Sequence, residues 1–243
     1  MFHLCLRDVI SYFWFIDRMY SKKKCLVYDL GIMDYLDALD IQNKLVDMRV
    51  SSKISDMLVL LEHPPVFTIG RSGEIDSVVA PNKVRQNTPV LYTNRGGGIT
   101  YHGPGQLICY PIFNLRENEL SVHKYISNLE EVVIKSLACL GVTGKRKEGY
   151  PGVWVNEEKI CSLGLRITRG VSMHGFALNV NTDLKYFTYI LPCGMSDKVI
   201  TSVSKLIRQK IDMRMVKKYV LQSFTYVFGI ELKESDDNLC LII

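Results

Sequence analysis

Long apolar runs are missing from this 243-residue sequence, which has no stretch of 18 apolar residues, no internal repeat and no low-complexity tract. The first absence argues against a membrane-spanning helix, and the second argues against a solenoid. At this length the chain could form one large domain or two small ones, and no Pro/Ser-rich linker divides it. Its hydrophobic fraction of 47% and charged fraction of 23% are typical of a folded soluble protein.

The cysteines lack the pattern of a disulfide framework. There are seven, an odd number, and no CxxC pair occurs among them. Several stand in apolar runs, where cysteine behaves as a small hydrophobic residue. This usage indicates a reducing compartment and no disulfides.

Charge of one sign does not accumulate either. The net charge is +5, and the only tight basic run covers residues 22–24. A short run of this kind is ordinarily a solvated face, so the sequence argues against a nucleic-acid partner. The mild positive bias is compatible with an acidic protein partner.

The hydrophobic pattern predicts strands and helices in alternation. Capping residues place helix starts at Asp34, Ser121 and Asp212, and a short helical segment is expected between 183 and 190. Apolar, β-prone runs predict the strands, at 25–28, 57–61, 66–69, 107–112, 152–155, 159–165 and 172–180. Because hairpins and helices are mixed, we expect an α+β fold with a mixed β-sheet flanked by helices.

The segment from Arg95 to Gln106 holds five glycines and a proline, with polar side chains between them. Glycine permits a positive φ and a close approach of the backbone to another group. Two interpretations stay open here: a tight turn between strands, or a bent loop that lines a binding pocket. A phosphate loop is disfavoured, because no Gly-Lys-Ser/Thr follows the glycines.

Two side chains are candidates for chemistry. Cys193 stands between Pro192 and Gly194, in a turn where a thiol can be exposed, although a buried structural cysteine is the alternative. Lys159 lies in a predicted strand, where it is either a solvated hairpin residue or a lysine drawn into a pocket. A nearby cation would lower the pKa of the thiol and favour the nucleophilic thiolate. The histidines lack the spacing of a common zinc site, so no metal is expected.

Several motifs together resemble the lipoyl(octanoyl) transferase family, and they occur in that family's order. The Gly-rich run with Tyr-His-Gly-Pro-Gly-Gln is the most specific of them. The matching stretches are residues 62–65, 68–71, 95–106, 152–154, 159–164, 174–179, 192–194 and 201–202. The match covers roughly residues 26–228. One departure is Cys161, where relatives often carry alanine.

The resemblance implies a domain of the biotin/lipoate protein ligase type. It implies that octanoyl passes from octanoyl-acyl carrier protein to a lysine of lipoyl domains, in dehydrogenase E2 subunits and glycine cleavage H protein. The acyl group would rest on Cys193, with Lys159 as its proton-exchange partner. No cofactor, metal, nucleic acid or membrane is implied, and a monomer is expected.

The resemblance also marks a substrate tunnel. The residues that it assigns to this tunnel are Arg95, Gly96, Gly97, Gly98, Ile99, Thr100, Tyr101, His102, Ser162, Leu163, Gly164, Gly175, Phe176 and Ala177. We expect the glycines to keep the tunnel walls low enough for an eight-carbon chain. The implied domains are an N-terminal extension at 1–24, which could include a leader, a catalytic domain at 25–230 and a C-terminal tail at 231–243.

Other functions remain as alternatives. An ATP-dependent lipoate–protein ligase shares the implied fold, a non-catalytic adaptor could bind lipoyl domains, and a zinc hydrolase is the third choice. The N-terminal extension and the stretch that follows Thr201 favour a mitochondrial location. A bacterial protein of this family would be cytoplasmic.

Overall fold

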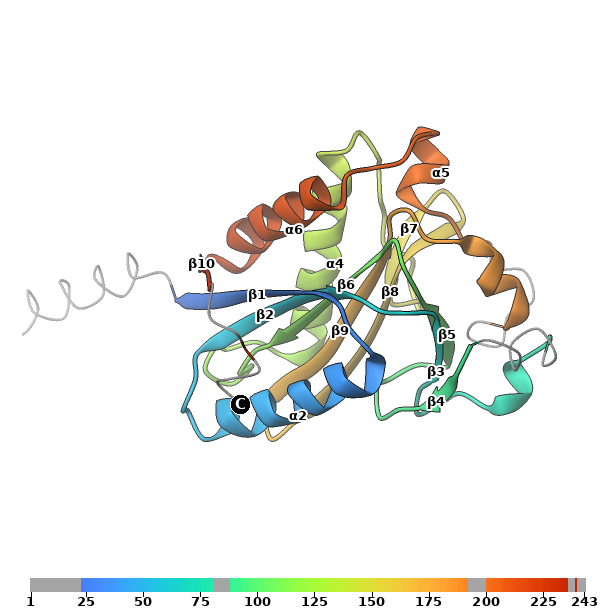
Figure 1. Cartoon of the computed structure of the whole chain (residues 1–243). Helices are drawn as coiled ribbons and strands as arrows, with labels where there is room; N and C mark the ends of the chain where they lie inside the picture. Colours follow the sequence, from blue (N-terminus) through green and yellow to red (C-terminus); the bar gives the residue numbers. More distant parts are fainter. Residues whose placement is uncertain (1–22, 81–87, 192–199, 236–238, 240–243) are drawn as a thin grey trace, which may run out of the picture.

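The structure is a computed structural model that describes residues 23–80, 88–191, 200–235 and 239. Its centre is a seven-stranded mixed sheet with helices on both faces, beside a three-stranded sheet of strand order β4-β3-β5 (Figure 1). The main sheet has the strand order β10-β1-β2-β6-β9-β8-β7. The predicted α+β class is therefore confirmed.

The strands and helices follow the expected segments closely. The strands are β1 (Lys24–Ile32), β2 (Asp56–Glu62), β3 (Val66–Ile69), β4 (Val90–Tyr92), β5 (Ile99–His102), β6 (Gln106–Ile112), β7 (Gly152–Val155), β8 (Glu158–Thr168), β9 (Val171–Asn179) and β10 (Glu231–Glu234). The α-helices are α2 (Tyr35–Val50), α4 (Val122–Ala138), α5 (Val203–Ile207) and α6 (Met213–Phe228). Short 3-10 turns occupy η1 (Ile75–Ser77) and η2 (Leu184–Tyr189).

The three predicted helix starts are confirmed, and the cause is the same in each. The side chains of Asp34, Ser121 and Asp212 accept hydrogen bonds from the backbone amides of Leu36, Lys124 and Arg214. Each bond satisfies an amide that has no partner inside its helix. The helices therefore begin where a short polar side chain precedes an apolar periodic segment.

Three segments differ from the sequence-based expectation. Within the predicted loop 95–106, residues 99–102 form β5, which pairs antiparallel with β3. The stretch assigned to a C-terminal tail contributes β10, which pairs parallel with β1. The strand predicted at 25–28 continues to Ile32 as β1. It includes Gly31, which has φ +62 at the point where the register with β2 shifts, so the chain forms a bulge there.

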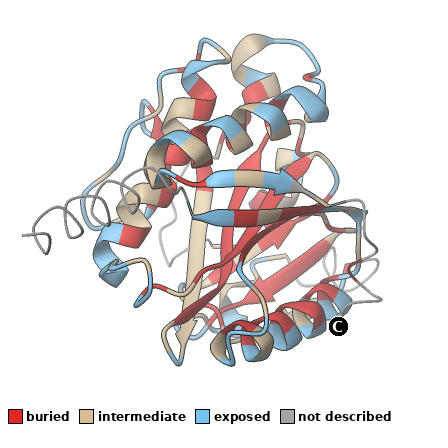
Figure 2. Ribbon diagram, turned by 90° about the vertical axis from the view of Figure 1, so that its left-hand side faces the viewer, coloured by how far each residue is buried: buried red, intermediate tan, exposed pale blue. Residues whose placement is uncertain are grey.

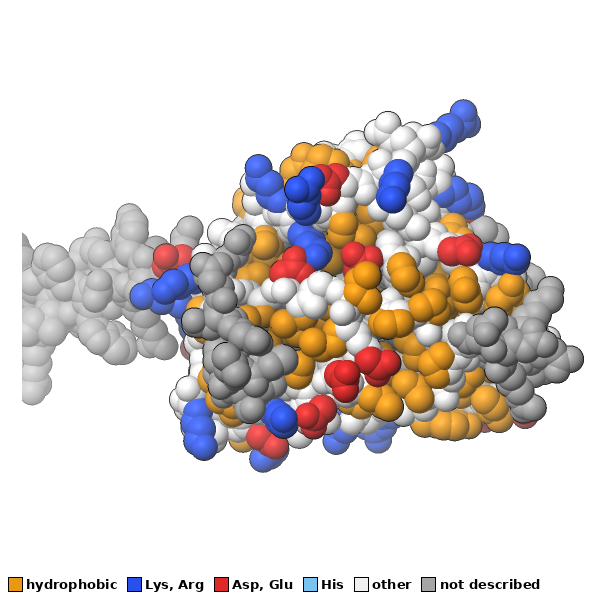
Figure 3. Space-filling model, in the orientation of Figure 1, with side chains coloured by type: hydrophobic (Ala, Val, Ile, Leu, Met, Phe, Trp, Pro, Cys, Tyr) orange, Lys and Arg blue, Asp and Glu red, His pale blue; other side chains and the backbone are white. Residues whose placement is uncertain are grey.

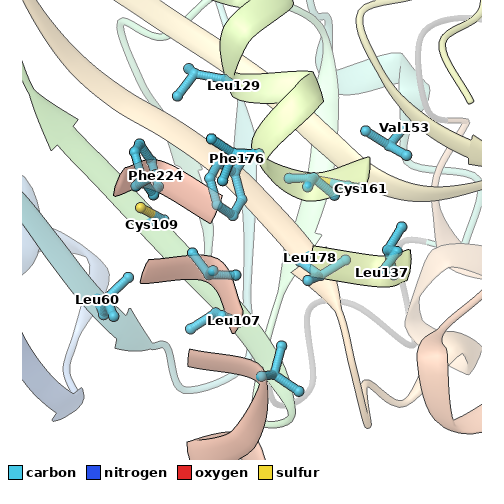
Figure 4. Close-up of a cluster of buried hydrophobic side chains, with 14 of the residues drawn as sticks. Leu60, Leu107, Cys109, Leu129, Leu137, Val153, Cys161, Phe176, Leu178 and Phe224 are labelled. Carbon is cyan, nitrogen blue, oxygen red and sulfur yellow. The ribbon is translucent and has the colours of Figure 1, made fainter. Parts of the chain in front are cut away.

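Two hydrophobic cores lie on opposite faces of the main sheet (Figures 1 and 2). Helices α4 and α6 pack together over one face, and α2 covers the other. The cluster beneath α4 and α6 includes Cys109, Cys161 and Phe224, all fully buried (Figure 4). Burial raises the pKa of both of these thiols, so they are packing residues, as expected for cysteines in apolar runs.

Figure 3 shows Lys and Arg side chains over the upper part of one face, where α5 and α6 lie, and also along the lower edge of that face. Among the described residues, no helix is both long enough and apolar enough to cross a membrane.

The α6 face provides a test of the core. Replacing Phe224, which is fully buried, with alanine should lower the free energy of unfolding by about 3–5 kcal/mol, because the ring leaves a cavity. Tyr226 on the same helix is 74% exposed and its ring lies under Lys135, so Tyr226→Ala should cost less than about 1 kcal/mol. Urea unfolding followed by circular dichroism would measure both, and equal losses would contradict this packing.

Candidate active site

A cavity of about 70 Å³ lies where β6, β8 and β9 meet the Gly-rich loop. It brings together most of the site residues expected from the sequence. These are Arg95, Gly97, Gly98, Ile99, Thr100, His102, Lys159, Ser162, Leu163, Gly164, Gly175, Phe176 and Ala177. Segments that are distant in the sequence therefore share one pocket.

Two expected site residues are placed differently, and a third is not described. Gly96 lines a neighbouring groove of about 450 Å³, and that groove also reaches Lys159. Tyr101 is not part of the cavity lining, and its ring stacks on Tyr186 with centroids 4.4 Å apart. Cys193 lies outside the described residues.

Six further residues line the cavity without having been assigned to the tunnel, namely Tyr35, Ile108, Tyr110, His174, Phe187 and Ile200. Tyr35 begins α2, and its hydroxyl is hydrogen-bonded to the Thr93 hydroxyl at 2.9 Å. Its helical spacing indicated only a core-facing residue, because the period of one helix cannot show which side chain borders a cavity. His174 directly precedes Gly175, a predicted tunnel residue, in the same sequence motif. That adjacency could have indicated that His174 also lines the cavity.

Lys159 is held in a buried position on β8 and is only 8% exposed. Its carbonyl accepts a hydrogen bond from the Thr201 amide at 3.0 Å, and its Nζ lies 5.3 Å from the centre of the Trp154 ring. The backbone at Gly152 has φ +132, and a Cβ there would lie 2.5 Å from Cε of the lysine. The glycine therefore makes room for this side chain, so Lys159 is the pocket lysine of the two alternatives.

A chain of hydrogen bonds connects the Gly-rich loop to the strand that carries the lysine. Arg95 donates through Nε and Nη2 to the Thr68 hydroxyl, at 3.1 and 2.8 Å. That hydroxyl is 3.2 Å from Nε2 of His102, and Nδ1 of the same ring is 2.8 Å from Oε1 of Gln106. Gln106 in turn donates to Oδ1 of Asn179 at 2.9 Å.

The last link of this chain returns to the lysine strand. Asn179 donates through Nδ2 to the Thr201 carbonyl at 3.1 Å, and Thr201 is the residue whose amide binds the carbonyl of Lys159. Every member from Thr68 to Thr201 is buried. Buried polar groups are costly unless paired, so this arrangement fixes the loop relative to β8.

The hydrogen bonds also set the protonation of the histidines. Because the Gln106 amide oxygen can only accept, Nδ1 of His102 carries the proton and Nε2 accepts from the Thr68 hydroxyl. For the same reason Nδ1 of His63 donates to the Met33 carbonyl, and its Nε2 accepts from the Tyr110 hydroxyl at 2.8 Å. Both rings are therefore neutral, and neither has a nitrogen left to hold a metal.

Burial opposes the charged form of all three site histidines. It lowers the pKa of His63 to about 4 and that of His174 to about 3, with Arg95 adding to the second shift. The pKa of His102 is also held well below its usual value, by burial first and then by His63 and Arg95. Within the described residues, no group of three or more His, Cys, Asp or Glu side chains could hold a metal ion.

Two glycines in the cavity wall have a role other than the expected one. A Cβ on Gly164 would lie 3.0 Å from the Gly96 carbonyl oxygen, and one on Gly175 would lie 2.1 Å from the Cys109 carbonyl oxygen. At both positions the missing side chain lets two backbone segments pass close together. The expectation that they mainly lower the tunnel walls is corrected at these positions, since their Cβ directions face backbone.

Comparisons with known proteins decide the family. Residues 34–225 match the family model of the lipoyl protein ligase A/B catalytic domain. This chain belongs to that family. An octanoyltransferase of Alkaliphilus metalliredigens is 40% identical over 212 residues, which cover 86% of this chain and 97% of the relative. One of Nostoc punctiforme is 42% identical over 212 residues, with coverages of 87% and 91%.

Solved structures agree on the fold. A lipoate-protein ligase A bound with ATP superposes with a TM-score of 0.70 at 16% identity, covering 88% of this chain and 89% of that one. The protein Ta0514 of T. acidophilum, a lipoate protein ligase by its description, gives 0.67 at 16% identity, covering 88% of each chain. The biotin/lipoate ligase fold is thereby confirmed.

The relatives confirm an acyltransferase of the octanoyltransferase class. The two named relatives are bacterial, so they do not support the mitochondrial location expected from the sequence.

The buried histidines predict a loss of stability in acid. A pKa near 4 in the folded state against about 6.5 unfolded means that the unfolded chain binds the proton first. The contribution of neutral His63 is complete above pH 6.5 and falls as the pH drops towards 4, by about 3 kcal/mol in all. Urea unfolding at several pH values between 7.5 and 4 would measure the slope of the unfolding free energy against pH. His63→Gln cannot titrate at this position and should make the slope shallower, while His102 and His174 keep their share of it. An unchanged slope would contradict the assignment.

Proposed function

We propose that the protein transfers an octanoyl group from octanoyl-acyl carrier protein to a lysine of a lipoyl domain, through an octanoyl thioester on Cys193. The observation that carries the proposal is the buried Lys159 in the lining of the cavity. The acceptors would be lipoyl domains of dehydrogenase E2 subunits and the glycine cleavage H protein. One related solved structure is described as a bipartite lipoate protein ligase and its E2 lipoyl domain from Thermoplasma acidophilum.

The cavity lining supports an acyl substrate. Along β8 and β9 the lining includes Ser162, Leu163, Phe176 and Ala177, and β5 contributes Ile99. Burying an eight-carbon chain at about 0.8 kcal/mol per methylene supplies roughly 5 kcal/mol, before the cost of ordering it. The substrate-binding residues in this proposal are those of the predicted tunnel.

In the first half-reaction, the amine of Lys159 takes the proton from the thiol of Cys193. The thiolate then attacks the carbonyl carbon of the donor thioester, and the bond to the carrier protein's sulfur breaks. The carrier protein leaves as a thiolate, which takes the proton back from Lys159 and becomes a thiol. A thioester replaces a thioester, so ATP is not consumed. Gly96 already donates its amide to the Leu165 carbonyl at 2.9 Å, so the oxyanion would be held by other amides of the loop.

In the second half-reaction, the amine of the acceptor lysine attacks the carbonyl carbon of the acyl thioester. An amide bond forms and the bond to the Cys193 sulfur breaks. Lys159 accepts the proton that the attacking amine loses and passes it to the departing thiolate. A lysine held in a buried pocket is placed to exchange a proton in this way.

The role of Cys193 as the nucleophile can be tested by measuring the mass of the protein. Incubation with octanoyl-acyl carrier protein should add one octanoyl group to the protein, detected by intact mass spectrometry without ATP. Cys193→Ser should form no stable adduct under the same conditions. Cys161→Ala is the matched control, because that thiol is buried and its pKa is raised by burial. An unchanged adduct in Cys193→Ser would remove Cys193 from this role, and a requirement for ATP would favour the ligase alternative.

The proton-exchange role of Lys159 can be tested by measuring the rate of adduct formation. Lys159→Ala should slow adduct formation by about a hundredfold or more, because the thiol loses its proton acceptor. Lys159→Met keeps most of the packing against Trp154 without the amine, so it separates lost chemistry from lost packing. Both variants should remain folded by circular dichroism. Near-normal turnover in Lys159→Met would exclude the proton-exchange role.

A further inference from the structure

His174 has a backbone conformation that is unusual for its place in a strand. It lies inside β9, yet its φ is +56. A residue with a side chain rarely adopts this left-handed region, and such strain is concentrated at functional sites. The ring lines the cavity and the residue is 2% exposed.

The neighbouring strand explains this conformation. β6 carries Pro111, which has no amide proton for the sheet, and its Cδ would lie 2.7 Å from a Cβ on Gly175. The antiparallel pairing of β9 with β6 ends at Phe176. The amide of His174 donates to Oε1 of Gln42 on α2 at 2.7 Å instead of to β6.

The ring is fixed on two sides. Nε2 of His174 donates to the Asn94 amide oxygen at 2.7 Å, and the ring meets the Tyr110 ring edge-on, with centroids 6.2 Å apart and an interplanar angle of 85°. The Tyr110 hydroxyl is itself bonded to His63. The pair of His174 and Tyr110 is therefore a rigid element of the cavity wall.

The strand register measures the distance from the lysine to this wall. Nζ of Lys159 would lie 3.1 Å from a Cβ on Gly152, and Gly152 pairs with Ser162 of β8. His174 pairs with Leu165, which is three residues farther along β8, or about 10 Å at the usual rise of a strand. Because β9 also lies two strands away from β7, or about 10 Å to the side, the two positions are about 14 Å apart. An extended eight-carbon chain, with bonds of about 1.5 Å, spans roughly 9 Å, and the thioester end beside the lysine and the imidazole ring occupy the remainder.

We infer that His174 closes the far end of the acyl cavity and limits the chain to about eight carbons, with Tyr110 as its support. This inference rests on the proposed function and adds the residue that selects the substrate. A longer chain would have to displace a ring that is held by Asn94 and Tyr110. The ring lines the cavity, so a shorter residue at this position would lengthen it.

The test compares acyl chains of different length. The rates of adduct formation with octanoyl-, decanoyl- and dodecanoyl-acyl carrier protein are measured by intact mass. Wild-type protein should take dodecanoyl at least about tenfold more slowly than octanoyl, since even one extra methylene is discriminated by about that factor. In His174→Gly the difference should shrink to less than about threefold. Glycine and asparagine both tolerate φ +56, so His174→Gly and His174→Asn should fold.

Asn94→Ala serves as the comparison, because it removes one support of the ring and leaves the ring itself. Its ratio of dodecanoyl to octanoyl rates should lie between those of the wild-type protein and His174→Gly. An unchanged ratio in His174→Gly, or an equal shift in Asn94→Ala, would overturn the inference. A wild-type protein that takes both chains equally fast would also overturn it. If no chain forms an adduct with wild-type protein, the proposed function itself fails.

Discussion

One backbone hydrogen bond, from the Gly96 amide to the Leu165 carbonyl, determines how the site is built. β7 pairs with β8 only as far as Gly152 and Ser162. Farther along β8, the Gly-rich loop takes the place that another strand would occupy. A Cβ on Gly96 would lie 3.2 Å from this same carbonyl oxygen, so the loop can approach β8 this closely only because it lacks a side chain there.

The neutral polar network depends on that attachment. Once the loop is fixed, Arg95 reaches Thr68 and the hydrogen bonds continue through His102 and Gln106 towards the strand that carries Lys159. Each amide and imidazole has one orientation that satisfies its neighbours. The histidines in this arrangement hold other groups in position, and their low pKa values mean that the rings themselves stay uncharged.

Much of this could be predicted from the sequence, because the signals were local. The starts of α2, α4 and α6 follow from a capping side chain and the next apolar residues. The Gly-rich segment was recognised as a pocket loop in one of two open interpretations, and its residues do line the cavity. The tunnel set from the resemblance agrees with the lining at most positions, since the same motifs converge there.

The remaining features depend on contacts between distant segments. β10 is four residues long and becomes a strand only because β1 offers it an edge. Tyr35 borders the cavity because α2 begins beside Thr93, which helical periodicity cannot reveal. The left-handed backbone of His174 follows from a proline on another strand, so the preference of histidine itself gave no indication of it.

The contact between Trp154 and Lys159 has a consequence of a different kind. The chain contains two tryptophans, Trp14 and Trp154, and only the second lies among the described residues. An indole 5.3 Å from an amine that changes its protonation is an emitter placed at the reaction centre. With Trp14 replaced by phenylalanine, the protein would carry a single intrinsic optical reporter, so that each half-reaction could be followed in real time without an added dye.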